Sequence, residues 1–404
     1  MLDAISSATL LDDDFRQDPS TLELEEWISQ LTGKEAGLFV VSGTMGNQLS
    51  IRSLLQSAPH SILCDARSHI MNYEAGGIAS LSGALTIPVH PANGKHLTLE
   101  DIQKAAVVAP HDHCACPTKL VCLENTFAGT ILPLAECRQI RDWTRQNDVK
   151  LHLDGARLWE AVAAGAGTLQ EYCECFDSVS LCFSKGLGAP IGSIIVGTLA
   201  FRERARWIRK SIGGGMRQAG VVSAAARRAV EDTFFGGRLQ ESHEKAKRIS
   251  RLWEGYGGKL LYPSETNMVW FDLAAAGVSM QSFREQGEAR GLKFMMGSRL
   301  VVHYQISEDA VQRLDDMMRT LLQAPEPPSV PKDVVTPAAT PPPELESKQS
   351  ARDDDKTSMA PVHTCAPNNQ ITDPDAYAGG PTQAMPGEEE AVQVDLGDES
   401  KSSA

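Results

Sequence analysis

The sequence predicts an α/β fold, in which helices cover both faces of a mostly parallel sheet, followed by a small C-terminal α+β domain. Up to about residue 236, short apolar runs alternate with segments of helical periodicity. Such alternation is typical of parallel sheets whose strands are buried on both faces. Beyond that point a long charged helix leads into a few strand-like runs. We therefore expect a large domain over residues 1–236 and a small domain over residues 237–323.

The elements of the large domain follow in order along the chain. Residues 18–36 predict a helix, because Asp18 or Ser20 can cap its start and Gly33 can end it. The strand-like runs that follow are GLFVV, SILCD, LTIPV, KLVCLEN, KLHLDG, SVSLCFS and GSIIVG. Between them, the turn SGTMGN leads into a helical segment, QLSIRSLLQ, and LAECRQIRDWTRQND has a helical pattern as well.

The small domain begins with the charged helix GRLQESHEKAKRISRLWEGYG. Two runs, NMVWFDL and RLVVHYQ, are typical of strands, and a helix is expected between them at about residues 280–290. The last helix, SEDAVQRLDDMMRTLLQ, is opened by Ser307, with Glu308 and Asp309 in its first turn, where acidic side chains favour the helix dipole.

Residues 324–404 differ in composition from the rest of the chain. They hold 13 of the 22 prolines, and their 15 acidic and 5 basic residues account for −10 of the chain's net charge of −14. With few large apolar side chains, this segment predicts a disordered acidic tail. The remaining body is only mildly acidic, which argues against a nucleic-acid-binding protein, since such a protein would normally carry a basic stripe.

Targeting and metal-binding signals are weak in this chain. No apolar run reaches transmembrane length, and the first twenty residues are acidic where a signal or transit peptide would be basic, so we expect a cytoplasmic protein without membrane contact. The nine cysteines show no disulfide framework, which fits a reducing compartment. The run HDHCAC at residues 111–116 matches no trusted zinc spacing, so we expect no metal site.

Three predicted strands deliver polar residues to one edge of the sheet. LVCLEN ends at Asn125, LHLDG ends at Asp154, and SLCFSK ends at Lys185. The steps between these residues are 29 and 31 positions, each the size of one strand-helix unit. Ligands of open parallel sheets bind at the carboxyl ends of the strands. An acid and an amine are therefore expected side by side.

A helix start that suits an anion is expected at the same edge of the sheet as the acid and the amine. In FVVSGTMGNQLS, Gly43 and Thr44 stand at a helix start, where free backbone N–H groups and the helix dipole favour an anion such as phosphate. A phosphate-binding helix start, a carboxylate and an amine together suit pyridoxal phosphate. This cofactor needs an amine for its aldehyde, an acid beside its pyridine nitrogen and a holder for its phosphate.

Several longer segments support this reading, among them HIMNYEAGGIASLSG, LENTFAGTILPL, HLDGARLWEA, SLCFSKGLGAPIGSIIVG and GGGMRQAG. In these segments the chain resembles the threonine aldolase and aromatic amino acid β-eliminating lyase family of fold-type I pyridoxal phosphate enzymes, with a fungal character. The resemblance covers most of residues 12–323 in the right order.

The resemblance implies a role for each matched residue. Lys185 would be the Schiff-base lysine, Asp154 would pair with the pyridine nitrogen, and Arg157 would lie near the ring oxygen and the substrate. Gly43 and Thr44 would hold the phosphate.

Three further residues complete the expected site. His69 would stack on the cofactor ring and stand close to the reacting atoms. Arg299 would bind the substrate carboxylate through a planar two-point contact, and Arg217 is a weaker candidate for an anion contact.

The implied reaction is that of a threonine aldolase, which cleaves the Cα–Cβ bond of L-threonine or L-allo-threonine to glycine and an aldehyde. The base would be the freed Lys185 or His69. Two departures from the family keep alternatives open. Relatives usually carry a further N-terminal stretch before DDDF, and the histidine that follows LENT in aldolases is here replaced by Phe127 and Ala128.

The alternatives are an alanine racemase of the same family, a β-eliminating lyase, and a catalytically silent member. Racemisation needs only proton removal and return at Cα, so it would tolerate the missing histidine. In this fold type the active site usually lies between two subunits. The resemblance therefore implies a homodimer or a homotetramer that binds a small amino acid substrate.

Overall fold

The structure is a computed structural model that describes residues 1–108, 113–294 and 297–323. The described residues belong to one compact unit. The predicted acidic tail, residues 324–404, lies outside the described residues, as does part of the HDHCAC run. None of the helices in the described ranges combines the length and the apolar character needed to cross a membrane.

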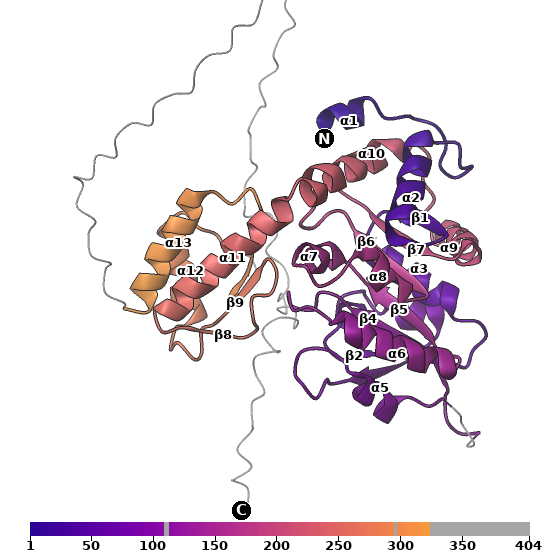
Figure 1. Cartoon of the computed structure of the whole chain (residues 1–404), viewed down its shortest axis with the longest axis horizontal. Coiled ribbons are helices and arrows are strands. Elements are labelled where there is room, and N and C mark those ends of the chain that lie inside the picture. Colours follow the sequence, from indigo (N-terminus) through magenta and orange to yellow (C-terminus); the bar gives the residue numbers. More distant parts are fainter. Residues whose placement is uncertain (109–112, 295–296, 324–404) are drawn as a thin grey trace, which may run out of the picture. The chain divides into compact units, whose positions relative to one another are not determined.

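Seven strands form the main sheet, and Figure 1 shows helices packed around it. They are β1 (Ala36–Val40), β2 (Ser61–Asp65), β3 (Leu85–Val89), β4 (Thr118–Glu124), β5 (Lys150–Asp154), β6 (Ser178–Cys182) and β7 (Ser193–Gly197). Their order across the sheet is β1-β7-β6-β5-β4-β2-β3. Every neighbouring pair is parallel except the two pairs that β7 makes with β1 and β6. The carboxyl ends of β1, β2, β4, β5 and β6 therefore share one edge.

Helices surround this sheet. They are α1 (Leu2–Ser6), α2 (Pro19–Thr32), α3 (Gly43–Leu54), α4 (His69–Asn72), the π-helix η1 (Ile78–Ser82), α5 (Leu99–Ala105), α6 (Leu134–Gln146), α7 (Leu158–Ala163), α8 (Leu169–Glu174), α9 (Leu199–Ser211), α10 (Gly220–Ala229) and the π-helix η2 (Val230–Phe235). The predicted first helix is present as α2. Asp18 precedes it, and Gly33 ends it in the left-handed conformation at a φ of 66°.

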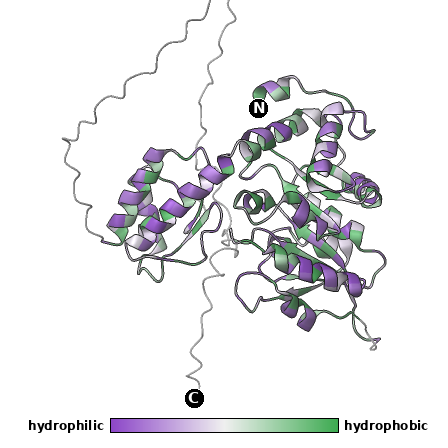
Figure 2. Cartoon of the chain, viewed as in Figure 1, coloured by the Kyte–Doolittle hydropathy of each residue, from purple (hydrophilic) through white to green (hydrophobic). Residues whose placement is uncertain are grey.

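Successive strand residues pack on opposite faces of the sheet, as the period of two requires. In β4, Val121 and Leu123 belong to the large core that includes residues of α2, α6, α7 and α8. The alternating residues Leu120 and Cys122 pack in a second cluster with Ile51 of α3. Because every residue of β1, β2, β6 and β7 is buried, these strands carry no polar-out pattern, and Figure 2 shows the strands as mainly hydrophobic.

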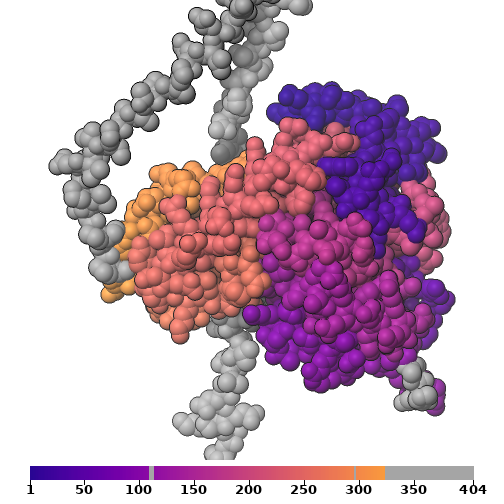
Figure 3. All heavy atoms as spheres, in the orientation of Figure 1, coloured from indigo at the N-terminus to yellow at the C-terminus, as the bar shows by residue number. Residues whose placement is uncertain are grey.

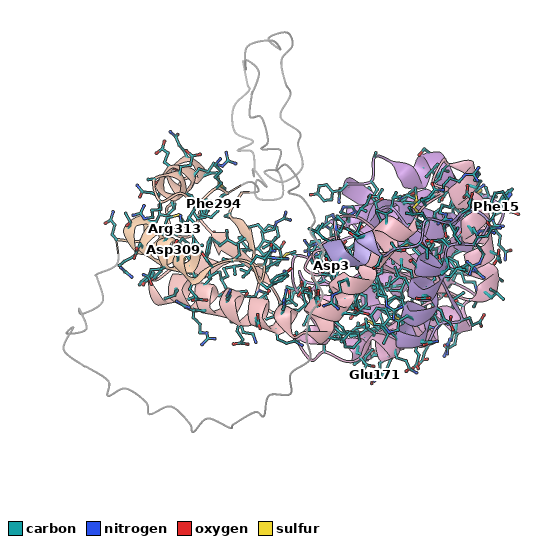
Figure 4. The ribbon with its side chains drawn as sticks, turned by 90° about the horizontal axis from the view of Figure 1, so that it is seen from above. Asp3, Phe15, Glu171, Phe294, Asp309 and Arg313 are labelled. Atoms are coloured by element: carbon teal, nitrogen blue, oxygen red, sulfur yellow. The ribbon has the colours of Figure 1, made fainter. Side chains whose placement is uncertain are left out.

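The second sheet is antiparallel and has the order β10-β9-β8. Its strands are β8 (Lys259–Leu260), β9 (Met268–Asp272) and β10 (Arg299–Val301), and its helices are α11 (Arg238–Gly255), α12 (Met280–Glu288) and α13 (Glu308–Leu321). Trp253, Phe271 and Phe283 lie at the centre of its core. On α13, Asp309 and Arg313 form an ion pair of 2.9 Å, one turn apart (Figure 4).

Two differences from the sequence prediction matter for the site. The run RLVVHYQ is a strand only as far as Val301, so His303 and Tyr304 lie beyond β10. The short helix α7 follows β5 directly, although no helix was predicted there. Short helices lack the repeated periodicity on which sequence prediction depends, and this one is held by burial of Leu158 and Trp159. The proposed domain boundaries stay a prediction.

Candidate active site

The carboxyl ends of β4 and β5 carry two acidic residues side by side. Glu124 and Asp154 are register partners at the ends of these strands. Both lie on the same face of the sheet as Cys122 and therefore face α3, since alternate strand residues share a face. Lys185 follows the end of β6, the next strand across the sheet. The structure thus brings Asp154 and Lys185 to one edge.

A hydrogen-bond network connects Asp154 to His69. The Asn47 amide, on α3, donates from Nδ2 to Asp154 Oδ2 and to Glu74 Oε1, both at 2.8 Å. The same oxygen of Glu74 accepts from His69 Nδ1 at 2.9 Å, while Gln48 donates to the other Glu74 oxygen at 2.6 Å. Glu74 is 3% exposed. A buried carboxylate therefore holds one nitrogen of His69 and leaves Nε2 for another partner.

Two histidines near this network have opposite electrostatic surroundings. The hydrogen bond to Glu74 raises the pKa of His69 above its ordinary value. His152 is fully buried behind Asn47, with 3.2 Å between its Nε2 and Asn47 Oδ1, and burial lowers its pKa to about 4. His69 is therefore the more readily protonated of the two, whereas His152 stays neutral and supports Asn47.

Glu124 lies next to the network and is not part of it. Its Oε2 accepts from the backbone N–H of His69 at 2.9 Å. Burial and the charge of Asp154 raise the pKa of Glu124 to about 7, while the nearby cationic groups His69 and Lys185 act in the other direction. One of the two adjacent carboxyl groups can therefore carry a proton near neutral pH.

The start of α3 forms an anion-binding surface at the same edge. Ser42 caps the helix through its hydroxyl, which accepts from Met45 N at 3.1 Å, and Gly43 and Thr44 form the first turn. A Cβ atom on Gly43 would lie 2.7 Å from Cys182 Sγ, so only glycine lets the helix start this close to the end of β6. The backbone N–H groups of the first turn suit a phosphate.

Lys185 stands in the turn between β6 and β7. Gly188, three residues later, adopts a φ of 83°, which allows the chain to turn tightly there. Lys185 is half-buried, and among the described residues its side chain forms no hydrogen bond or ion pair. Its amine is therefore available to an external partner.

Two arginines approach the site from different parts of the chain. Arg157 precedes α7, and its Nε is buried without a hydrogen-bond partner in the described part of the chain. Arg299 begins β10 and lies 5.4 Å from the centre of the Trp270 ring. Burial lowers the pKa of Arg157, and the charge of Arg299 lowers it further. Two cations whose charges act on each other favour a carboxylate between them.

Arg217 is the one candidate that the structure places elsewhere. It lies between α9 and α10, is exposed, and forms an ion pair with Asp12. Its guanidinium is 5.6 Å from the ring of Phe15, which lies at the surface, far from the C-terminal sheet (Figure 4). Its anionic partner comes from its own chain.

Sequence reasoning missed Glu74, Asn47 and Gln48 as parts of the site. Their signal was weak, because the two amides lie in an ordinary helix and Glu74 follows His69 by five residues in a loop. A metal ion is another ligand that this cluster could bind, since ligand atoms of His69, Glu74 and Asp154 lie within 4.8 Å of one another. The same three side chains already take part in the hydrogen-bond network described above.

Pyridoxal phosphate fits the residues present. The carboxylate of Asp154, 4% exposed, can face a pyridine nitrogen, and the first turn of α3 can take a phosphate. Lys185 offers an amine without a partner among the described residues. The buried Nε of Arg157 likewise has no hydrogen-bond partner among them. Together these groups match the donors and acceptors of the cofactor.

Known proteins are similar to this chain over most of its length. The model of the β-eliminating lyase family matches residues 1–276. Aldolase vrtJ of Penicillium aethiopicum is 62% identical, over 80% of this chain and 82% of its own length. Alanine racemase TOXG of Cochliobolus carbonum is 46% identical (80% and 84%), and the low-specificity L-threonine aldolase of Candida albicans is 43% identical (80% and 85%).

A solved structure confirms the predicted fold. The threonine aldolase of Leishmania major superposes with a TM-score of 0.68 at 20% identity, over 80% of this chain and 95% of its own. The α/β arrangement is therefore that of fold-type I enzymes. The β-eliminating lyase and threonine aldolase family indicates pyridoxal phosphate as the cofactor.

Proposed function

Because this chain belongs to the β-eliminating lyase family, we propose that it is a pyridoxal phosphate-dependent aldolase. It cleaves the Cα–Cβ bond of a β-hydroxy-α-amino acid, L-threonine or L-allo-threonine, to glycine and an aldehyde. The aldolases among its relatives support this activity. In the site, the single observation that carries it is the pair formed by His69 and the buried Glu74.

The cofactor would be held by residues from three parts of the sheet edge. Lys185 would offer the amine for its aldehyde, Asp154 would face the pyridine nitrogen, and Gly43 and Thr44 would hold the phosphate. When bound, pyridoxal phosphate supplies the electron sink for the bond that breaks at Cα. Asn47 fixes the orientation of Asp154 through its hydrogen bond of 2.8 Å.

The substrate carboxylate is bound between Arg157 and Arg299. Both are near enough for one charge to act on the other, and burial strengthens their attraction for an anion. A carboxylate held by two guanidinium groups has a fixed orientation, which places the Cα–Cβ bond in the geometry that cleavage needs.

His69 is the base for the β-hydroxyl proton. Family aldolases carry a histidine after LENT, and here Phe127 takes that position with its ring 4.3 Å from the Arg67 guanidinium. Phe127 cannot accept a proton. Glu74 holds Nδ1 of His69, so that Nε2 carries the free lone pair and Glu74 stabilises the imidazolium that forms.

The test is a substrate panel of L-threonine, L-allo-threonine and L-alanine, run on the parent protein and on His69→Gln. We expect aldehyde release from one or both threonines, and a loss of about 10²-fold or more in His69→Gln, the size of a general-base effect. His90→Gln, at an exposed histidine, is the matched control. Unchanged aldehyde release in His69→Gln would remove His69 from the mechanism.

Alanine racemisation is the second candidate. It is favoured by the similarity to alanine racemase TOXG and by Phe127 in place of the histidine, since racemisation requires no base at a β-hydroxyl. In the same panel, D-alanine without aldehyde would replace the aldolase proposal. Ammonia release from a β-substituted amino acid would indicate a β-eliminating lyase. Cofactor binding without any turnover would indicate a silent member.

We also propose that the protein is a homodimer or homotetramer in the cytoplasm. The oligomer rests on the family resemblance, and the location rests on the nine cysteines, which show no disulfide framework. Light scattering after size-exclusion chromatography tests the first, and microscopy of a fluorescent fusion tests the second.

A further inference from the structure

A small pocket lies behind Lys185, on the side of α7. Lys185 and Gly186 line it together with three residues that precede or begin α7, namely Arg157, Trp159 and Glu160. Each of these three carries a buried polar atom without a hydrogen-bond partner among the described residues: Arg157 Nε, Trp159 Nε1 and Glu160 Oε1. Buried polar atoms of proteins are normally paired, so three such atoms around one pocket point to a polar occupant.

Glu160 is held from the other side by α11. Its Oε2 lies 2.7 Å from His243 Nε2, and both side chains are at most 3% exposed. Oε1 packs directly against Gly186, because a Cβ atom at that position would clash with it. The carboxylate therefore has one paired oxygen and one oxygen directed at the residue next to Lys185.

The pocket has the size and the polarity of a site for one water molecule. Its volume is about 10 Å³, of the order that a single water needs, and a buried water usually makes about three hydrogen bonds. Arg157 Nε and Trp159 Nε1 can donate to such a water, and Glu160 Oε1 can accept from it. The fourth hydrogen-bonding direction of this water is left for the Lys185 amine.

We propose that this pocket binds one ordered water through which the Glu160–His243 pair acts on the Lys185 amine. Glu160 and His243 are then positioning residues: they orient Lys185 and place a negative charge beside its nitrogen without contacting the substrate. The inference rests on the proposed role of Lys185 as the residue that holds the cofactor.

Other charged and titratable groups lie around Lys185. Glu124 and Cys182 interact electrostatically with Lys185 itself, and Asp154 and Arg157 interact with both of these residues. Arg299 interacts with Arg157, and His303 interacts with Glu160. All of them stay in place when only Glu160 is changed. A difference measured in a Glu160 variant therefore reports Glu160 and its water.

The experiment is a pH titration of the visible absorbance of the cofactor bound to the full-length protein. Loss of the Glu160 charge disfavours a cationic nitrogen at Lys185, so Glu160→Gln is expected to lower the titration midpoint by about one pH unit. Glu25→Gln removes another buried carboxylate, which lies on α2 and pairs with Arg16. This control is expected to titrate like the parent.

Trp159→Phe is the second variant, and it decides the case if Glu160→Gln does not bind the cofactor. It keeps the ring packing against Phe183 and Phe234 but deletes the N–H directed at the pocket. We expect a smaller shift in the same direction. If the parent protein shows no absorbance that borohydride fixes, the proposed function fails. If the parent titrates and both variants share its midpoint, only this inference fails.

Discussion

Arg209 and Arg157 are two buried cations of the same chain with different partners. Arg209, on α9, is 1% exposed, donates from Nη1 to the Phe39 carbonyl at 2.7 Å and from Nη2 to Asp13 at 2.9 Å. Both arginines have a buried Nε without a hydrogen-bond partner in the described residues, but the Arg157 side chain forms no other hydrogen bond or ion pair there either, and the largest electrostatic influence on it after burial is another cation, Arg299.

The partners of Arg209 belong to an acidic run at the start of the chain. Asp12 pairs with Arg217, Asp13 with Arg209, and Asp14 with Lys210 at 2.5 Å. The backbone N–H groups of Asp13 and Asp14 also donate to the segment before α10, and Figure 3 shows the N-terminal residues lying along that part of the surface. This run acts as a clamp that holds the segment between α9 and α10.

The difference separates structural charges from functional ones. Burial of a charge costs free energy unless an opposite charge and hydrogen bonds compensate it. In the acidic clamp the compensation comes from within the chain. Around Arg157, Lys185 and Glu160 it is incomplete, which is the pattern expected where a ligand supplies the missing partners.

The largest expected effect comes from removing the Lys185 amine, which lies where the charges are incompletely compensated. We predict that Lys185→Ala lowers aldehyde release by more than about 10³-fold, because Lys185 is the one primary amine among the residues that line the pocket at this edge. The cofactor absorbance that borohydride fixes should disappear as well. Activity that persists in this variant would overturn the mechanism.

The next effect concerns the acidic clamp, whose charges are compensated within the chain. Asp13→Ala leaves Arg209 buried without its carboxylate, and we predict a loss of about 3 kcal/mol in the free energy of unfolding. Asp14→Asn, whose partner Lys210 is exposed, should cost less than about 1 kcal/mol. Denaturant unfolding measures both. Equal losses in the two variants would contradict the view that burial makes the clamp stabilising.

A pair of arginine variants compares the candidate site, through Arg157, with the acidic clamp, through Arg217. Arg157→Gln is predicted to raise the KM for the amino acid by about 10- to 100-fold, the range of a charged hydrogen bond, with little loss of stability. Arg217→Gln should leave the KM within about twofold, because Arg217 is exposed and already paired with Asp12. If Arg217→Gln shows the larger effect on KM, Arg217 belongs to the site after all.

The smallest effect is a change in pH dependence. The pKa of Glu124 rises from 4.5 to about 7 on folding, so the folded state binds more protons than the unfolded state between these values. The free energy of unfolding of the cofactor-free protein should therefore fall as pH rises from about 4.5 to about 7. Glu124→Gln should make this fall shallower, which unfolding at pH 5 and pH 8 measures. An unchanged slope would assign the raised pKa elsewhere.

Much of the fold could be predicted from residue patterns. All seven strands of the main sheet coincide with runs that the sequence marks as strand-like, five of them lying entirely within the run and β1 and β4 beginning one residue before it. Each run is a short apolar stretch bounded by polar or glycine residues. The reversed direction of β7 could not be predicted, because an apolar run has no sign that tells which way its strand runs. The short helices α4, α7 and α8 were missed because four to six residues carry too little periodicity.

For the site, the sequence by itself determined which residues stand at strand ends and helix starts. Asp154 and Lys185 follow from the spacing of strand-helix units, and Gly43 and Thr44 follow from a glycine turn at a helix start, both of which are local properties of the chain. Only the tertiary structure decided which charges are already paired. Arg217 meets Asp12 across 205 residues, and Glu160 meets His243 across 83. Such pairs form where distant elements pack together, and no local pattern encodes that packing.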